Sequence, residues 1–122
     1  MTTSIESTTT LTVEIAGETG WMPVCSYADL VPGRGVAVLI EGHQVAVFRD
    51  RAGRLYALAN RDPFSGAYVM SRGIVGQRGE VPTIASPMYK QVFDLRTGEC
   101  LDEDEGPDGD PAALRTWAVR TR

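Results

Sequence analysis

Cysteine and histidine are the side chains with the widest range of metal and nucleophilic chemistry, and this chain of 122 residues has only Cys25, Cys100 and His43. A structural zinc site takes four Cys or His ligands, and a two-iron cluster of mixed ligation takes two Cys and two His. Three residues fill neither set. Two cysteines are also too few for the disulfide framework of a small secreted domain. The inventory argues against all three kinds of site.

Residue arrangements typical of catalysis are missing around these side chains. His43 adjoins Gly42 at a turn, which is typical of an exposed polar residue. Cys25 ends an apolar stretch and is interpreted as a small buried hydrophobe, and nothing nearby marks Cys100 as an activated thiol. The chain has no G-x-S-x-G elbow and no phosphate-binding glycine loop. We therefore expect no catalytic residue; an independent enzyme using Cys100 or Asp62 is the alternative.

Composition restricts the class of protein further. Hydrophobic residues make up 43% and charged residues 23%, which is typical of one globular domain. A formal net charge of −4 and a pI near 4.9 argue against nucleic acid as a partner. No apolar run reaches the roughly 20 residues that cross a bilayer, and the polar start of the chain does not resemble a secretory signal. These features predict a cytoplasmic protein without a membrane partner.

The negative charge is concentrated in one segment. Residues 99–110 hold seven of the sixteen acidic residues and no basic one, so the remainder carries nine acids against twelve bases. Clustered charge usually stays solvated, and we expect an exposed acidic loop at about residues 99–113. A docking element for a basic partner surface is the alternative.

Short strands joined by turns are expected to position any site. The apolar runs Val36–Ile40 and Gln44–Arg49 flank a Glu-Gly-His turn and predict a β-hairpin, which residues 54–60 extend into a meander. Further strand character appears at residues 83–85, 92–95 and 114–121, and a single helical turn at residues 28–31. Residues 61–82 have no sustained period and predict a functional loop. The fold class is all-β, an antiparallel sandwich or barrel with little helix; residues 1–15 are expected to be flexible and residues 16–122 to form the domain.

From residue 35 to residue 98 the sequence resembles a Rieske-type domain. The resemblance rests on the hairpin, the strand LYALAN, a first loop DPFSGAYVMSRG and a second loop SPMYKQVFDLRTGEC. It implies two facing loops, which in that family carry the Cys-x-His and Cys-Pro-x-His cluster ligands. Those positions hold Asp62, Phe64, Ser86 and Tyr89 here.

These four residue types are unsuited to a two-iron cluster, which needs thiolate and imidazole ligands. We therefore expect no cofactor and no metal in this chain. Our hypothesis is that Phe64, Met88 and Tyr89 form an aromatic plug that fills the space between the two loops by apolar burial.

The motifs DPFS, SRGIVG and SPMYKQVFDLRTGEC further resemble those of the small subunits of NADH-dependent assimilatory nitrite reductases. The resemblance covers roughly residues 21–119, although the acidic segment is a departure that other members need not share. It implies an accessory subunit of a cytoplasmic enzyme that reduces nitrite to ammonium. The partner is a large subunit carrying FAD, siroheme and a 4Fe–4S cluster. The alternative is a stand-alone electron carrier of the Rieske ferredoxin type.

The two loops also supply a candidate partner interface, in which apolar residues are surrounded by basic ones. The candidate residues are Arg61, Tyr68, Arg72, Met88, Tyr89 and Lys90. The alternative is that the aromatic residues only pack the loops together and the basic residues form a solvated face.

Overall fold

The computed structural model describes residues 11–122 as an all-β chain, as the sequence predicts. The strands are β1 (Thr12–Gly17), β2 (Gly20–Ser26), β3 (Gly35–Ile40), β4 (His43–Arg49), β5 (Leu55–Ala59), β6 (Ile74–Arg78), β7 (Val81–Ala85), β8 (Val92–Asp94), β9 (Thr116–Trp117) and β10 (Val119–Thr121). Two single-turn 3-10 helices, η1 (Tyr27–Asp29) and η2 (Met70–Arg72), interrupt them. Within residues 11–122, no helix has the length and hydropathy to cross a membrane.

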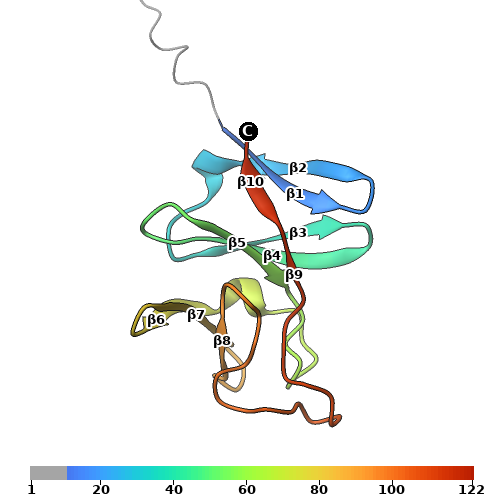
Figure 1. Cartoon of the computed structure of the whole chain (residues 1–122), viewed down its shortest axis with the longest axis vertical. Helices are drawn as coiled ribbons and strands as arrows, with labels where there is room; N and C mark the ends of the chain where they lie inside the picture. The colour runs from blue at the N-terminus through green and yellow to red at the C-terminus, as the bar shows by residue number, and fades with distance from the viewer. Residues whose placement is uncertain (1–10) are drawn as a thin grey trace, which may run out of the picture.

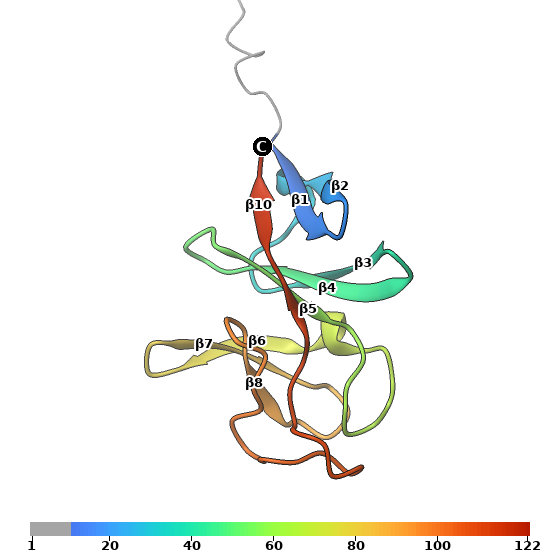
Figure 2. The same cartoon turned by 45° about the vertical axis from the view of Figure 1, so that its right-hand side comes forward.

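The strands form three antiparallel sheets that lie one below another in Figures 1 and 2. The upper sheet has the order β10-β1-β2, the middle sheet β3-β4-β5-β9 and the lower sheet β6-β7-β8. The C-terminal segment runs upward from the middle sheet, through β9, to pair β10 with β1. The last strand of the chain is therefore hydrogen-bonded to the first.

Strand β4 lies between two hydrophobic cores because both of its faces are buried. Val45 and Val47 face the core shared with the upper sheet, whereas Ala46 and Phe48 face the core shared with the lower sheet. Successive side chains of a strand point to opposite faces, so a strand covered on both sides needs a continuous apolar run. The sequence Val-Ala-Val-Phe meets that requirement.

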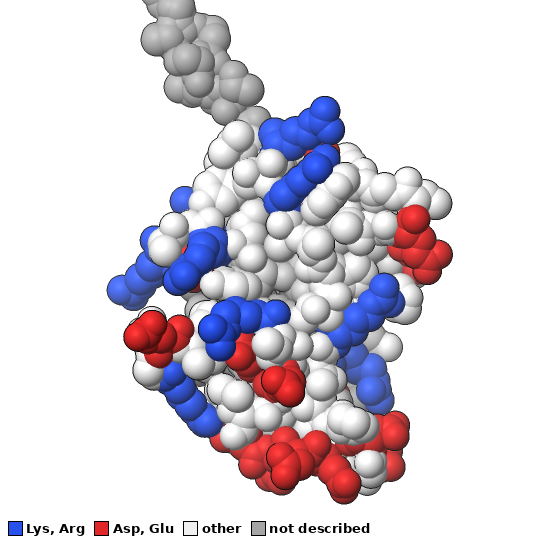
Figure 3. Space-filling model, viewed as in Figure 1, with Lys and Arg blue, Asp and Glu red and all other residues white. Residues whose placement is uncertain are grey.

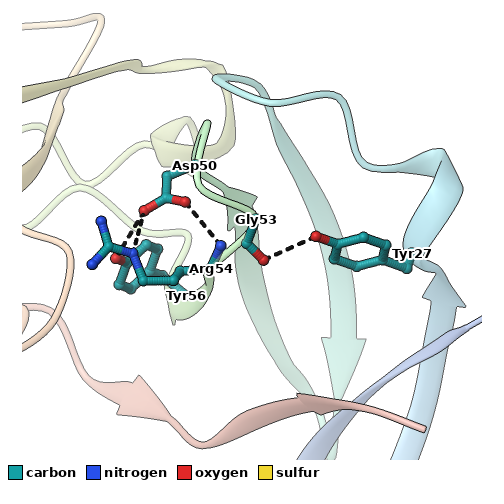
Figure 4. Close-up of polar contacts among 5 residues, drawn as sticks. All are labelled: Tyr27, Asp50, Gly53, Arg54 and Tyr56. Atoms are coloured by element: carbon teal, nitrogen blue, oxygen red, sulfur yellow. Dashed lines mark hydrogen bonds and ion pairs between the residues drawn. The ribbon is translucent and has the colours of Figure 1, made fainter.

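The turn between β4 and β5 is fixed by Asp50 (Figure 4). Its Oδ1 accepts the backbone N–H of Arg54 at 2.8 Å, and its Oδ2 accepts Arg54 Nε–H at 2.9 Å and the Tyr56 hydroxyl at 3.2 Å. Burial raises the pKa of Asp50, but the hydrogen bonds from Arg54 and Tyr56 outweigh it and leave the pKa lowered. The Tyr27 hydroxyl donates to the carbonyl oxygen of Gly53 at 2.9 Å, which links η1 to the same turn.

Two expectations about the chain's course are wrong. The sequence predicts flexibility through residue 15, but β1 begins at Thr12 because Val13 and Ile15 are fully buried between its neighbours. Residues 1–10 lie outside the described residues. The segment 61–82, which was expected to be irregular, contains β6 and the start of β7, and these two strands pair with each other. The sequence of β6 lacks an alternation of apolar and polar residues because most of this strand is exposed. The expected helical turn at residues 28–31 is the 3-10 turn Tyr27–Asp29. The strands expected at residues 36–40, 44–49, 54–60, 83–85 and 92–95 are present, whereas the single closing strand expected at residues 114–121 is divided into β9 and β10, which pair in different sheets.

Candidate functional site

The first loop, residues 61–69, leaves β5 and is held in shape by the residues at its base. The Asn60 carbonyl oxygen accepts the N–H of Met70 at 3.0 Å, and Asn60 Oδ1 accepts the N–H of Ser71 at 2.7 Å. Within the loop, Arg61 and Tyr68 face each other across an antiparallel bridge. These contacts close the loop across its base.

The second loop, residues 86–91, joins β7 to β8 as a tight turn. The Ser86 N–H donates to the Gln91 carbonyl oxygen at 3.0 Å, and Ser86 Oγ accepts the Met88 N–H at 3.2 Å. Lys90 has a φ of +65°, a left-handed conformation that non-glycine residues adopt at a cost. The turn therefore places Met88 and Tyr89 at its tip rather than inside the domain.

A buried hydrogen bond connects the two loops at two of the four positions that the Rieske resemblance assigns to cluster ligands. Ser86 Oγ–H donates to Asp62 Oδ2 at 2.6 Å, and Asp62 and Ser86 are 0% and 1% exposed. The other oxygen of the carboxylate, Oδ1, accepts the Phe64 N–H at 2.9 Å. We call the contact between Asp62 and Ser86 the loop latch; it joins segments that are 24 residues apart in the sequence.

The aromatic plug is wrong for two of its three members. Met88 is 49% exposed and Tyr89 is 61% exposed, so neither is buried between the loops. Phe64 alone points inward, where its ring lies 6.3 Å from the ring of Phe93 at an interplanar angle of 53°. The loop latch joins the two loops, and the contact between Phe64 and Phe93 packs the first loop against β8.

The residues at these positions do not fit a two-iron cluster. The Asp62 and Ser86 oxygens bond each other, the Phe64 ring has no donor atom, and Tyr89 is exposed. Residues 11–122 hold no group of three or more His, Cys, Asp or Glu side chains placed to bind a metal ion. The two loops therefore supply no ligand set of the kind that an iron–sulfur cluster requires.

The thiols are placed outside the two loops. Cys25 lies in β2 and packs against the upper core, where burial first and the nearby Asp29 carboxylate second raise the pKa of the thiol. A raised pKa disfavours the reactive thiolate. Cys100 packs against the lower core beside β8, and His43 starts β4. The geometry gives no nucleophile–base pair for an independent enzyme.

The six residues expected at a partner interface are all exposed, which contradicts the alternative that the aromatic ones pack the loops together. Tyr68 is 55% exposed, Met88 49% and Tyr89 61%. Arg61, Arg72 and Lys90 are also exposed, and Arg61 faces Tyr68 across the bridge in the first loop. Acidic side chains form a band along the lower edge of the molecule in Figure 3, where Figure 1 places the loop after β8, and smaller acidic patches lie at other places on the same face.

Sequence reasoning missed the partnership between Asp62 and Ser86, and it missed Trp117 and Arg115 beside the first loop. The Arg115 guanidinium carbon lies 4.2 Å from the centre of the Trp117 ring. The sequence could have indicated this pair, because Arg115 and Trp117 alternate with Val119 along the closing segment. In an extended strand, residues two apart lie on the same face.

Comparison with known proteins decides the family. Residues 20–122 match the Rieske-like [2Fe-2S] domain family. The nitrite reductase (NADH) small subunit of Salmonella typhimurium is 38% identical over 86 residues, which cover 70% of this chain and 80% of that protein. The chain belongs to this family of small subunits. Its position within the Rieske-like domains agrees with the order of strands and loops described above.

Two further relatives show how the family is built. The crystal structure of a protein named as an NADH-dependent nitrite reductase small subunit from Mycobacterium tuberculosis has a TM-score of 0.69 at 39% identity, covering 92% of this chain and 96% of that one. A nitrite reductase (NAD(P)H) large subunit from Klebsiella oxytoca is 36% identical over 101 residues, which are 82% of this chain but only 10% of that protein. In that organism a domain of this family is part of the large polypeptide.

Proposed function

We propose that this chain is an accessory, cluster-free small subunit of a cytoplasmic NADH-dependent nitrite reductase. Its partner is the large subunit that holds FAD, siroheme and a 4Fe–4S cluster and reduces nitrite to ammonium. The observation that carries the proposal is the loop latch. The Rieske frame of two loops is kept, but two ligand positions are joined by a hydrogen bond and a third carries a phenylalanine packed inward.

The domain content of the Klebsiella oxytoca large subunit supports the proposed partner. That polypeptide contains a stretch related to 82% of this chain. A domain found as part of a large subunit in one organism and as a separate chain in another is expected to contact the same large subunit in both. In the separate chain the covalent link is replaced by a non-covalent interface.

The proposed interface is the exposed surface of the two loops and the adjoining η2, formed by Arg61, Tyr68, Arg72, Met88, Tyr89 and Lys90. The three exposed apolar or aromatic side chains suit the centre of a protein interface, and the three exposed cations suit its rim. The strained backbone at Lys90 is consistent with a tip that is shaped for contact, since such strain is found most often at functional sites.

Co-purification with the large subunit tests the function. The tagged chain is co-expressed with the large subunit of the same organism, and the bound flavin and haem are measured after affinity purification. We expect the large subunit to elute with the wild-type chain, and the double variant Arg72→Glu/Lys90→Glu to retain at most about one tenth of it, because reversed charges at a rim oppose association. The control reverses Arg34 and Arg51, two exposed arginines outside both loops.

Absence of the large subunit from the wild-type eluate would overturn the proposed function. Equal retention by the loop variant and the control would move the interface away from the two loops.

The alternative function is an electron carrier of the Rieske ferredoxin type, which the family's description favours because it names a 2Fe–2S cluster. That function needs four suitable ligands at positions 62, 64, 86 and 89. A visible absorption spectrum of the purified chain separates the two: a colourless protein agrees with the accessory function, and a broad visible absorption supports the carrier.

A further inference from the structure

A pocket of about 360 Å³ lies beside the first loop, between the β3–β4 hairpin and the segment that enters β9. Its walls come from four parts of the chain that are far apart in the sequence. The larger or charged side chains that line the pocket include Leu39, His43, Arg61, Tyr68, Arg115 and Trp117. Arg61 and Tyr68 are also members of the proposed interface, so the pocket is continuous with it.

Trp117, which lines the pocket, contacts two other lining residues and has an indole N–H that is unpaired within residues 11–122. Trp117 is 9% exposed, with the His43 ring 6.0 Å away and the Arg115 guanidinium 4.2 Å above its ring. The buried indole N–H of Trp117 has no hydrogen-bond partner among the described residues. Buried polar groups are usually paired, so an unpaired one beside a pocket favours a missing acceptor.

The charge of the pocket is positive. Neither Arg61 nor Arg115 forms an ion pair within residues 11–122, and no carboxylate lines the pocket. The carboxylate of Glu41, in the adjoining hairpin turn, is turned away and accepts the backbone N–H of Glu18 at 3.0 and 3.2 Å. Two free guanidinium groups with no local counter-charge favour an anionic ligand.

The rim of the pocket is apolar. Leu39 is 68% exposed and Tyr68 is 55% exposed, and both line the pocket. Exposed apolar side chains next to a concave, partly aromatic surface are typical of a protein-binding site in which one side chain of the partner is inserted. The ligand that fits has carboxylates for the arginines and an apolar side chain for the rim.

We propose that this pocket receives an acidic segment of the large subunit that inserts one apolar anchor side chain between Leu39, Tyr68 and Trp117. The proposal rests on the proposed function and adds the chemistry of the contact. The chain's own acidic loop is engaged elsewhere at Asp102, whose two carboxylate oxygens accept Arg78 and the N–H of Val92. An external acidic segment is therefore the occupant that the charges favour.

Binding of the purified chain to the immobilised large subunit tests the pocket, at low and at high salt. The variant Arg61→Glu/Arg115→Glu is expected to weaken binding about tenfold or more at low salt and to lose most of the salt dependence of the wild type. Arg115→Lys keeps the charge but loses the planar guanidinium that stacks on Trp117, and it is expected to bind more weakly than the wild type but more tightly than Arg61→Glu/Arg115→Glu. The control Arg34→Glu/Arg51→Glu makes the same charge change outside the pocket and is expected to bind like the wild type.

The indole donor is tested separately by Trp117→Phe, which keeps an aromatic ring and removes the N–H. We expect about three- to tenfold weaker binding, because a hydrogen bond to the partner's carboxylate is lost. Thermal unfolding of every variant confirms that it is folded before binding is compared.

The results distinguish the pocket from the function. If Arg61→Glu/Arg115→Glu binds like the control while Arg72→Glu/Lys90→Glu binds weakly, the pocket proposal is wrong and the proposed function stands. If the wild-type chain does not bind the large subunit at all, both are wrong. If gel filtration shows a dimer of this chain that only the pocket variant dissociates, while binding to the large subunit is unchanged, the occupant is a second copy and the proposal is overturned.

Discussion

Removing the Ser86 hydroxyl is the most informative change to the loop latch. In Ser86→Ala the Asp62 carboxylate stays buried but loses its donor at 2.6 Å, and keeps only the Phe64 N–H at 2.9 Å. Hydrogen bonds to charged groups contribute about 1.5–3 kcal/mol, and an unsatisfied buried partner adds a desolvation cost. We expect a loss of about 2–3 kcal/mol in the free energy of unfolding, which lowers the Tm by roughly 6–12 °C for a domain of this size.

The assay is urea unfolding of four proteins: wild type, Ser86→Ala, Asp62→Ala and the double variant. In the Asp62→Ala background, Ser86 has no carboxylate to which its hydroxyl can donate. Ser86→Ala is therefore expected to lower the free energy of unfolding by only about 1 kcal/mol or less in that background. Ser65→Ala is the matched control, because Ser65 Oγ accepts only the Ala67 N–H within the first loop. An unchanged midpoint for Ser86→Ala, or costs that simply add in the double variant, would refute the loop latch.

Three further perturbations test the packing around it. Phe64→Ala is expected to cost about 2 kcal/mol, less than for a fully buried ring, since Phe64 is partly buried against Phe93; a cost near zero by urea unfolding would contradict this contact. The Arg96 hydrogen bond lowers the pKa of Asp94 against its burial, so its stabilisation is present above the ordinary carboxyl pKa of about 3.9 and lost as pH falls below it. In Arg96→Ala, the free energy of unfolding should fall less between pH 6 and pH 3 than it does in the wild type. An identical fall in both proteins would show that the ion pair between Arg96 and Asp94 does not cause the pH dependence. Gly98→Ala is expected to cost about 3 kcal/mol, because φ is +82° and a Cβ would collide with a backbone carbonyl; a wild-type Tm would show that the turn can relax.

The parts of the fold that were predictable from the sequence have strong local patterns. The hairpin of residues 36–49 combines β-branched residues with a Gly-containing turn, so its strands and register were predictable. Strand β1 was missed although Val13 and Ile15 alternate, because its stability depends on β10, which lies more than a hundred residues later. Strand β6 was missed because four of its five residues are exposed and its pattern carries no apolar face.

Only some features of the candidate site were predictable from the sequence. The positions Asp62 and Ser86 were predictable from the order of the loops, but not their hydrogen bond, since proximity between residues 24 apart depends on how the two loops face each other. The inward or outward direction of Tyr89 depends on the left-handed backbone at Lys90, which sequence patterns do not indicate. The pocket around Trp117 joins four segments and becomes visible only in three dimensions.

We propose that this chain keeps the Rieske frame but serves as a partner-binding subunit rather than as an electron carrier. Iron and acid-labile sulfide are measured in the purified full-length chain after anaerobic incubation with ferrous iron and sulfide, followed by desalting. We expect iron near zero per chain and no visible absorption, because positions 62, 64, 86 and 89 supply no thiolate or imidazole. Two irons and two sulfides retained per chain, with a broad visible spectrum, would contradict it.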